Sequence, residues 1–352
     1  MSDKCVIVFN GDDASPEVMV PAVELLKSMQ LPIHFEYPLI GADAKRKTGH
    51  AFPDETKVAI DSSDTTFFGS TSGESIAALF YLRWGKQTYA NVRPCEWYPG
   101  FNSPLADPKG IDFVVVRENL EDLYLGIEGD IQELESLNLY SPHAKALLSD
   151  LGPGKYAIKA ITQLGSERVI RYAFELARAR NKSRRVTLTS KYNMLSLSDE
   201  YFRSIGESIA KEYPDIHYEN YIVDDFLCRM ITNPQVLDVV VTPNLYGDIL
   251  SDGAAGLIGG LGLAPSGCYG ESYAYFESAH GTAPDIAGKN IINPTATLLS
   301  ACMMLEYLGF ENESEVIRKA IKKVYAKGEV LTHDQRGGAS TTEFCGAVAR
   351  FV

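Results

Sequence analysis

A chain of 352 residues is longer than one small domain, and its hydrophobic content of 45% is enough for two packed lobes. The formal net charge of -13 argues against nucleic acid or an anionic membrane surface as the main partner. No apolar run approaches the ~18 residues of a transmembrane helix, no signal peptide is visible, and six scattered cysteines without a CxxC pair indicate a reducing, cytoplasmic location.

The first 69 residues alternate predicted strands and helices. Residues 5–9 and 33–37 read as strands, and residues 18–29 between them as a helix with Ser15 as N-cap and Pro16 at its first position. A helix over residues 53–60 and a strand over residues 65–69 follow. This order predicts a parallel sheet. The fingerprint GxGxxG is absent after the first strand, which argues against an ordinary Rossmann dinucleotide site.

Three arginines stand at the ends of predicted elements. Arg83 ends a helix over residues 76–84, Arg93 ends a strand that starts at residue 89, and Arg117 ends a strand over residues 111–117. Each one alone could be a surface ion pair. Because arginine is the side chain suited to bidentate carboxylate binding, three of them in an acidic chain predict an anion pocket.

The middle of the chain combines an irregular segment with further strands and helices. Glycines and prolines interrupt residues 122–163, which we interpret as an arm or insertion used for subunit contact. An amphipathic helix over residues 166–180 precedes a strand over residues 184–190 that delivers Lys191. The carboxyl end of a strand is where α/β proteins place functional side chains, although a solvated lysine is the alternative. A helix over residues 199–213 and a strand over residues 217–223 lead to Asp224.

Two acids after the next strand suggest a metal site. Residues 239–241 form an apolar run, and Asp248 and Asp252 follow it four positions apart, which places both on one face of a helix. Their repulsion would be relieved by a divalent cation, and hard oxygen ligands suit Mg2+ or Mn2+. The alternative is a helix terminus that favours acids.

The last hundred residues begin with a glycine-rich passage. Glycines between residues 256 and 267 predict either a phosphate-binding loop or a tight turn after a helix. A loop over residues 277–288 then leads to a helix with Asn293 as N-cap and Pro294 at its first position. Helices over residues 294–307 and 314–327 close the fold.

Six segments together resemble a known family. They are Arg83 with Arg93-Pro94, residues 117–124 (RENLEDLY), Lys191-Tyr192-Asn193, Asp224, residues 244–252 (NLYGDILSD) and residues 280–288 (HGTAPDIAG). Over nearly the whole chain, this set resembles the β-decarboxylating dehydrogenases, the isocitrate/3-isopropylmalate dehydrogenase family. The resemblance implies an isopropylmalate-dehydrogenase-like two-domain α/β fold with a mostly parallel sheet, not a Rossmann fold.

The domain boundaries and the assembly also follow from this resemblance. Residues 1–88 and 259–352 would form a large, cofactor-side domain. Residues 89–258 would form a small domain for dimerisation, metal and substrate, with an arm at about 122–163. The partners implied are a small-molecule 3-substituted malate and a second copy of the chain, in a homodimer or higher oligomer with shared active sites.

The chemistry implied by the resemblance is an NAD-dependent and metal-dependent oxidative decarboxylation. The ligands for Mg2+ or Mn2+ would be Asp224, donated by the second subunit, and Asp248 and Asp252. The substrate carboxylates would be held by Arg83, Arg93 and Arg117, and Asn193 would align substrate and nicotinamide. Lys191 would take the proton of the C2 hydroxyl, and Tyr124 would protonate the enolate that remains after CO2 loss.

The cofactor residues implied by the resemblance are His280, Gly281, Thr282, Ala283, Asp285, Ile286 and Asn293. A carboxylate at position 285 would accept hydrogen bonds from the ribose hydroxyls and repel a 2′-phosphate. Relatives that use NADP carry Lys-Tyr in place of Asp285-Ile286. NAD is therefore the expected cofactor.

The substrate signals conflict. Isocitrate enzymes place Ser and Asn where this chain has Ala77 and Leu79, and an apolar wall would leave the third carboxylate of isocitrate unpaired. Residues 124–128 nevertheless follow the isocitrate pattern, and polar groups of residues 70–75 could bind that carboxylate by another route. We expect isocitrate, and 3-isopropylmalate, homoisocitrate and another 3-substituted malate stay open, as does a non-catalytic regulatory subunit. Ser190, Tyr192 and the loop over residues 12–15 depart from the family pattern.

Overall fold

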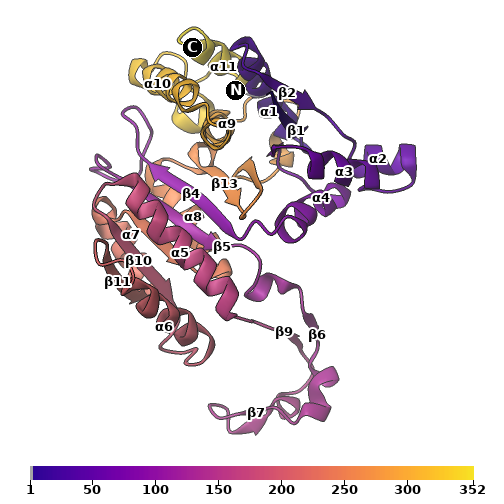
Figure 1. The fold of residues 1–352 in the computed structure, drawn as a ribbon, viewed down its shortest axis with the longest axis vertical. Coiled ribbons are helices and arrows are strands. Elements are labelled where there is room, and N and C mark those ends of the chain that lie inside the picture. Colours follow the sequence, from indigo (N-terminus) through magenta and orange to yellow (C-terminus); the bar gives the residue numbers. More distant parts are fainter. Residues whose placement is uncertain (1–2) are drawn as a thin grey trace.

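The computed structural model describes residues 3–352, and its centre is one ten-stranded sheet (Figure 1). The strand order is β11-β10-β12-β5-β4-β13-β14-β3-β1-β2. Six of the neighbouring pairs are parallel and three are antiparallel, the latter being β13–β14, β13–β4 and β4–β5. The predicted fold class, an α/β protein with a mostly parallel sheet, is confirmed.

The sheet consists of two groups of strands that meet at the β4–β13 pair. One group is β4 (Ala90–Glu96), β5 (Asp112–Glu118), β10 (Arg185–Ser190), β11 (His217–Ile222) and β12 (Val239–Thr242). The other is β1 (Lys4–Phe9), β2 (Ile33–Glu36), β3 (Thr65–Phe68), β13 (Pro265–Tyr269) and β14 (Ala274–Ser278). The chain passes between the groups after residue 68 and again before residue 265.

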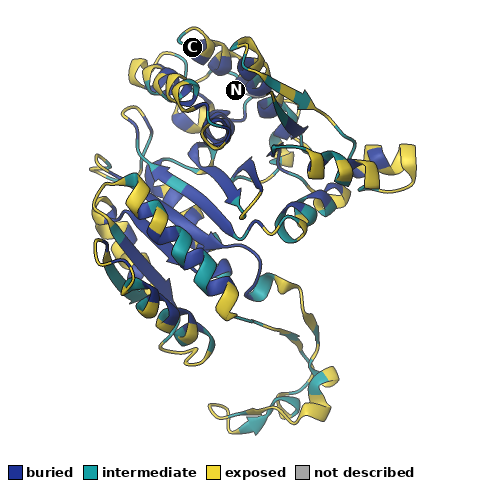
Figure 2. Cartoon of the chain, viewed as in Figure 1, coloured by how far each residue is buried: buried dark blue, intermediate teal, exposed yellow. Residues whose placement is uncertain are grey.

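Helices cover this sheet, and the buried residues concentrate where the two meet (Figure 2). α5 (Gln163–Arg180) packs on β5 and β12, and α8 (Asn244–Ile258) packs on β4 and β5. α9 (Thr295–Tyr307) packs on β13 and β14 and is buried on every side from Thr295 to Leu305, because α1 (Ser15–Ser28) and α10 (Glu311–Lys327) cover it. The remaining helices are α2 (Gly41–Thr48), α3 (Asp54–Ser62), α4 (Ile76–Phe80), α6 (Ser198–Ala210), α7 (Val223–Thr232) and α11 (Thr341–Ala349).

The segment between β5 and α5 leaves the body as an extended arm (Figure 1). It contains two short ladders, β6 (Glu128–Asp130) with β9 (Lys155–Ala157) and β7 (Tyr140–Ser141) with β8 (Ala146–Leu147). Large apolar side chains on it, including Leu137 and Tyr140, are exposed. The predicted use of this arm for subunit contact stays a prediction.

Several local predictions were wrong. Ser15 does not cap α1, because the helix already includes it and its buried Oγ has no hydrogen-bond partner in the described part of the chain. α9 begins at Thr295 with Pro294 as N-cap, although Asn293 Oδ1 still accepts the Thr295 N–H at 2.9 Å. β11 ends at Ile222, so Asp224 lies in the first turn of α7.

The glycine-rich passage contains the predicted tight turn after a helix. Gly259 and Gly260 follow α8 with φ values of 131° and 123°, which side chains rarely adopt. Residues 265–269 are then strand β13. All six cysteines are free thiols, and among residues 3–352 we find no helix whose length and hydropathy would let it cross a bilayer.

Candidate active site

Two of the three predicted arginines lie side by side in the sheet. Arg93 and Arg117 are interior residues of β4 and β5, which pair antiparallel, so the prediction that they end their strands was wrong. Arg117 is only 1% exposed and Arg93 7%. Arg83 lies in a π-helical turn (Tyr81–Gly85) after α4 and donates to Tyr275 Oη at 3.3 Å. Buried guanidinium groups require anionic partners.

Those partners are the two acids of α8. Arg93 Nη1 lies 3.4 Å from Asp248 Oδ1 and 3.2 Å from Asp252 Oδ1. Arg117 also donates to Asp248, and Tyr124 Oη donates to the other oxygen of that carboxylate at 2.5 Å. The structure therefore brings together five of the residues that the sequence singled out, from β4, β5, the start of the arm and α8.

Burial and charge set the protonation of this cluster. Burial, together with the neighbouring Arg93, lowers the pKa of Arg117 to about 10. Burial opposes ionisation of Asp248, but Arg117 and the Tyr124 hydrogen bond hold its pKa below the ordinary value. Burial raises the pKa of Asp252, and the Asp248 charge adds to this effect while Arg93 opposes it. Burial and the bond to Asp248 raise the pKa of Tyr124, so this phenol keeps its proton.

A second group of predicted residues lies at the carboxyl ends of β10 and β11. The register pairs Ser190 with Ile222, so Lys191 and Asp224 emerge near each other, and Lys191 Nζ donates to Asp224 Oδ1. This hydrogen bond lowers the pKa of Asp224. The backbone N–H of Lys191 is held by Asp199 Oδ2 at 2.7 Å. Asn193, two residues on, is exposed.

The three predicted metal ligands do not form one cluster within this chain. Across residues 3–352, no three aspartate, glutamate, histidine or cysteine side chains gather in a way that could hold a metal ion. Asp248 and Asp252 lie on one face of α8, whereas Asp224, in the first turn of α7, pairs with Lys191 at the end of β10. The carboxylates of α8 offer the hard oxygen donors that Mg2+ and Mn2+ prefer, so the residues present fit such an ion if Asp224 comes from another chain.

A cavity of about 440 Å³ contains most of the predicted cofactor residues. Its lining includes His280, Gly281, Ala283, Ile286 and Asn293. Burial lowers the pKa of His280, and its Nε2 has no hydrogen-bond partner in the described residues. A neutral imidazole with a free nitrogen beside apolar walls fits an adenine ring.

The sequence missed part of this cavity, and two of the predicted cofactor residues lie outside its lining. Leu261, Gly262, His333 and Asp334 also line it, and Asp334 Oδ2 accepts the Asn293 amide at 2.9 Å. No local motif marks His333 or Asp334. Thr282 and Asp285 are outside the lining, and Asp285 is exposed in the turn Pro284–Ile286.

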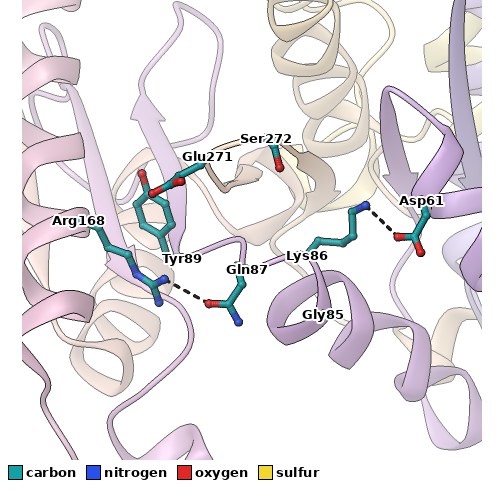
Figure 3. A pocket seen from close by; sticks show the side chains of 8 residues that line it. All are labelled: Asp61, Gly85, Lys86, Gln87, Tyr89, Arg168, Glu271 and Ser272. Carbon is teal, nitrogen blue, oxygen red and sulfur yellow. Dashed lines mark hydrogen bonds and ion pairs between the residues drawn. The ribbon is translucent and has the colours of Figure 1, made fainter.

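A second cavity, of about 430 Å³, lies where the chain passes between the two strand groups and contains none of the predicted site residues (Figure 3). It is polar: Lys86 pairs with Asp61 at 3.0 Å, and Arg168 donates to Gln87 Oε1 at 3.3 Å. Because no predicted site residue lines it, we do not treat this cavity as the candidate active site.

Comparison with known proteins now decides the family. The model described as isocitrate/isopropylmalate dehydrogenase matches residues 5–348. This chain belongs to the isocitrate/isopropylmalate dehydrogenase family. It is therefore an oxidoreductase of the decarboxylating type, in a family of metal-dependent dehydrogenases that use NAD or NADP and act on small malate-type substrates.

Individual members of the family are similar to this chain over nearly the whole length of both chains. The 3-isopropylmalate/3-methylmalate dehydrogenase of Methanocaldococcus jannaschii is 42% identical over 99% of this chain and 98% of its own. The 3-isopropylmalate dehydrogenase of Archaeoglobus fulgidus is 40% identical over 99% of each. The crystal structure of isocitrate dehydrogenase from Methylococcus capsulatus has a TM-score of 0.86 and 36% identity, covering 99% of both chains.

Proposed function

We propose that this family member catalyses the NAD-dependent, Mg2+- or Mn2+-dependent oxidative decarboxylation of a 3-substituted malate with an apolar substituent, 3-isopropylmalate being the best candidate. The observation that carries this choice is the surface of α4. Leu79 and Phe80 precede Arg83 by one turn, and Phe80 is about half exposed and packs edge-on against Trp84 at 5.4 Å. An apolar wall beside the substrate arginine favours an alkyl group over a third carboxylate.

The polar route for a third carboxylate, over residues 70–75, is partly occupied. Ser70 Oγ donates to the His280 carbonyl at 2.7 Å, and Ser75 Oγ donates to Asp12 at 3.3 Å, and both serines are buried. Glu74 is paired with Lys45. Thr71 Oγ1, by contrast, has no hydrogen-bond partner in the described residues, so it is the hydroxyl of this segment that a γ-carboxylate could still use.

Isocitrate, which the sequence favoured, is the second candidate. The segment over residues 124–128 keeps the isocitrate pattern. The isocitrate dehydrogenase of Thermus thermophilus that uses NADP is 39% identical to this chain, a relation close to that of the isopropylmalate enzymes.

The roles of the side chains follow from their surroundings. Arg83, Arg93 and Arg117 bind the substrate carboxylates, and Lys191 accepts the C2 hydroxyl proton. A bound nicotinamide would supply the hydride acceptor. Tyr124, whose raised pKa keeps it protonated, donates a proton to the enolate carbon. A divalent ion held by Asp248, Asp252 and Asp224 of the partner subunit would polarise the ketone. A homodimer joined through the arm would supply that partner.

The test is NADH formation with Mn2+ from 3-isopropylmalate, isocitrate, homoisocitrate, tartrate and malate, each also with EDTA. We expect kcat/KM for 3-isopropylmalate to exceed that for isocitrate by at least ~100-fold, because the latter buries an unpaired carboxylate, and we expect EDTA to abolish turnover. The reverse order would select isocitrate. Absence of turnover with every compound would favour a regulatory subunit, and EDTA-resistant turnover would contradict the metal site.

A further inference from the structure

Lys159, at the root of the arm, lies between two fully buried carboxylates. Its Nζ is 2.6 Å from Asp199 Oδ1 and 3.3 Å from Asp122 Oδ1, and both aspartates are 0% exposed. The ammonium also lies 4.5 Å from the centroid of the Tyr246 ring. Neither Oδ1 accepts a hydrogen bond of good geometry in the described residues, so the charge of Lys159 is what balances them.

The second oxygen of each carboxylate holds the backbone of a site segment. Asp199 Oδ2 accepts the N–H of Lys191 at 2.7 Å, and Asp122 Oδ2 accepts the N–H of Leu245 at 2.9 Å. Lys191 is the proposed base, and Leu245 belongs to the first turn of α8, which carries Asp248 and Asp252. One ammonium thus orients two carboxylates, and each carboxylate orients one part of the site.

The same contacts fix the backbone that leads to Tyr124. Asp122 has a φ of 69°, in a region that residues other than glycine rarely adopt. Its N–H donates to the Ala160 carbonyl at 2.9 Å, one residue after Lys159. Tyr124 follows two residues later, so the direction in which it leaves the sheet depends on this conformation.

We propose that Lys159 is a positioning residue for the reaction: through Asp122 and Asp199 it fixes the backbone segments that carry Tyr124, Lys191 and the metal-binding face of α8. This inference rests on the proposed function. Lys159 is not among the residues proposed to bind substrate or metal. Its removal would release three segments that are far apart in sequence, whereas a lysine that merely stabilises the fold would affect all parts of the molecule alike.

The test compares Lys159→Met with Lys155→Met as a matched control in the full chain. Lys155 lies four residues earlier in the same arm and pairs with Asp130 at 2.6 Å, but its side chain is 77% exposed. Mn2+ affinity is measured by electron paramagnetic resonance and kcat with the best malate of the panel. NADH affinity is measured by fluorescence, because the cofactor cavity shares no residue with the Lys159 contacts.

We expect Lys159→Met to lower both kcat and Mn2+ affinity by roughly 10–100-fold, as loss of a group that supports site residues does, with NADH affinity unchanged. Lys159→Arg, which keeps the charge, should recover most of both, and Lys155→Met should behave as wild type. If Lys159→Met does not fold, the double variant Lys159→Met/Asp199→Asn also removes one of the two carboxylate charges that Lys159 would otherwise balance. It should show the same two losses.

Two results would overturn the inference. One is unchanged kcat and Mn2+ affinity in Lys159→Met, and the other is a parallel loss of NADH affinity, which would mean general destabilisation. A wild-type chain that oxidises no malate would refute the proposed function separately, and the Mn2+ comparison would still decide the role of Lys159.

Discussion

At the scale of single residues, the candidate site is a balance of buried charges. Arg93 and Arg117 form ion pairs with Asp248 and Asp252. Under the proposed function, the same arginines turn to the substrate carboxylates while the acids turn to the metal. Each binding event thus replaces one set of ion pairs by another, which avoids leaving a buried charge without a partner.

Cofactor choice is argued at this scale. Asp285→Lys with Ile286→Tyr should shift the ratio of kcat/KM for NADP over NAD upward by ~100-fold or more, because a cation replaces the carboxylate that repels the 2′-phosphate. Steady-state kinetics with both cofactors measures this ratio, and Lys289→Met serves as a control for a nearby change of charge. An unchanged ratio would contradict the assignment of Asp285 to the ribose.

Glu118 gives a prediction on pH dependence. Burial raises its pKa to about 7 from an ordinary 4.5, with Glu121 adding to the effect and the N–H groups of Leu120 and Glu121 opposing it. Between these two values the folded chain binds more protons than the unfolded chain, so the contribution of Glu118 to stability falls as pH rises.

Replacement of the Glu118 side chain by a neutral one should remove its contribution to the pH dependence of stability. In Glu118→Gln the loss of stability between pH 5 and pH 8 should be smaller than in wild type, by on the order of 2–3 kcal/mol at 1.36 kcal/mol per pKa unit. Thermal unfolding across this pH range measures it, and Glu55→Gln, at an exposed position, should follow wild type. A Glu118→Gln profile parallel to wild type would refute the raised pKa.

At the scale of elements, one glycine lets α8 approach β5. A Cβ at Gly247 would lie 2.6 Å from Arg117 Cβ and Cγ and 3.1 Å from its Cα. This close contact sets the distance over which Arg117 reaches Asp248, one residue later on the helix. Backbone atoms cannot move away from such an overlap as a flexible side chain can.

A matched pair of substitutions in α8 tests this packing. Gly247→Ala should destabilise the chain by about 1–3 kcal/mol through overpacking and lower kcat. Gly256→Ala, where an added Cβ meets nothing within 4 Å, should be neutral or stabilising by up to about 1 kcal/mol. Chemical denaturation and kcat measure both, and equal effects of the two would show that the contact with Arg117 does not matter.

At the scale of the whole molecule, one chain holds the proposed metal ligands in two places. The acids of α8 face Arg93 and Arg117, whereas Asp224 faces Lys191. The exposed apolar side chains of the arm indicate how a second chain could be held. A two-fold dimer would create two equal sites, each built from both chains.

Mixed dimers test this arrangement. Asp224→Asn and Asp252→Asn should each be inactive alone, but their co-expression should restore about a quarter of wild-type activity, because half of randomly paired dimers contain one intact site. The activity of the co-expressed mixture measures this, and the tagged and purified heterodimer, with one intact site of two, should have about half of wild-type activity. No recovery would mean that Asp224 and Asp252 of the same chain act together.

The sequence by itself determined those features that depend on local order. The strand and helix alternation predicted the α/β class, the four-residue spacing placed Asp248 and Asp252 on one helix face, and the motifs led to the family. It did not predict the β13–β14 hairpin, because glycines and short strands carry little periodic signal.

Only the tertiary structure decided which distant residues meet. His333 and Asp334 join Asn293 in the cofactor cavity across forty residues, and Lys159 meets Asp199 where the arm returns to the body. No local pattern marks these residues, since ion pairs and cavity walls arise from contacts between elements. Spacing along a helix or strand reports which face a side chain takes, and the packing of the sheet decides what stands opposite.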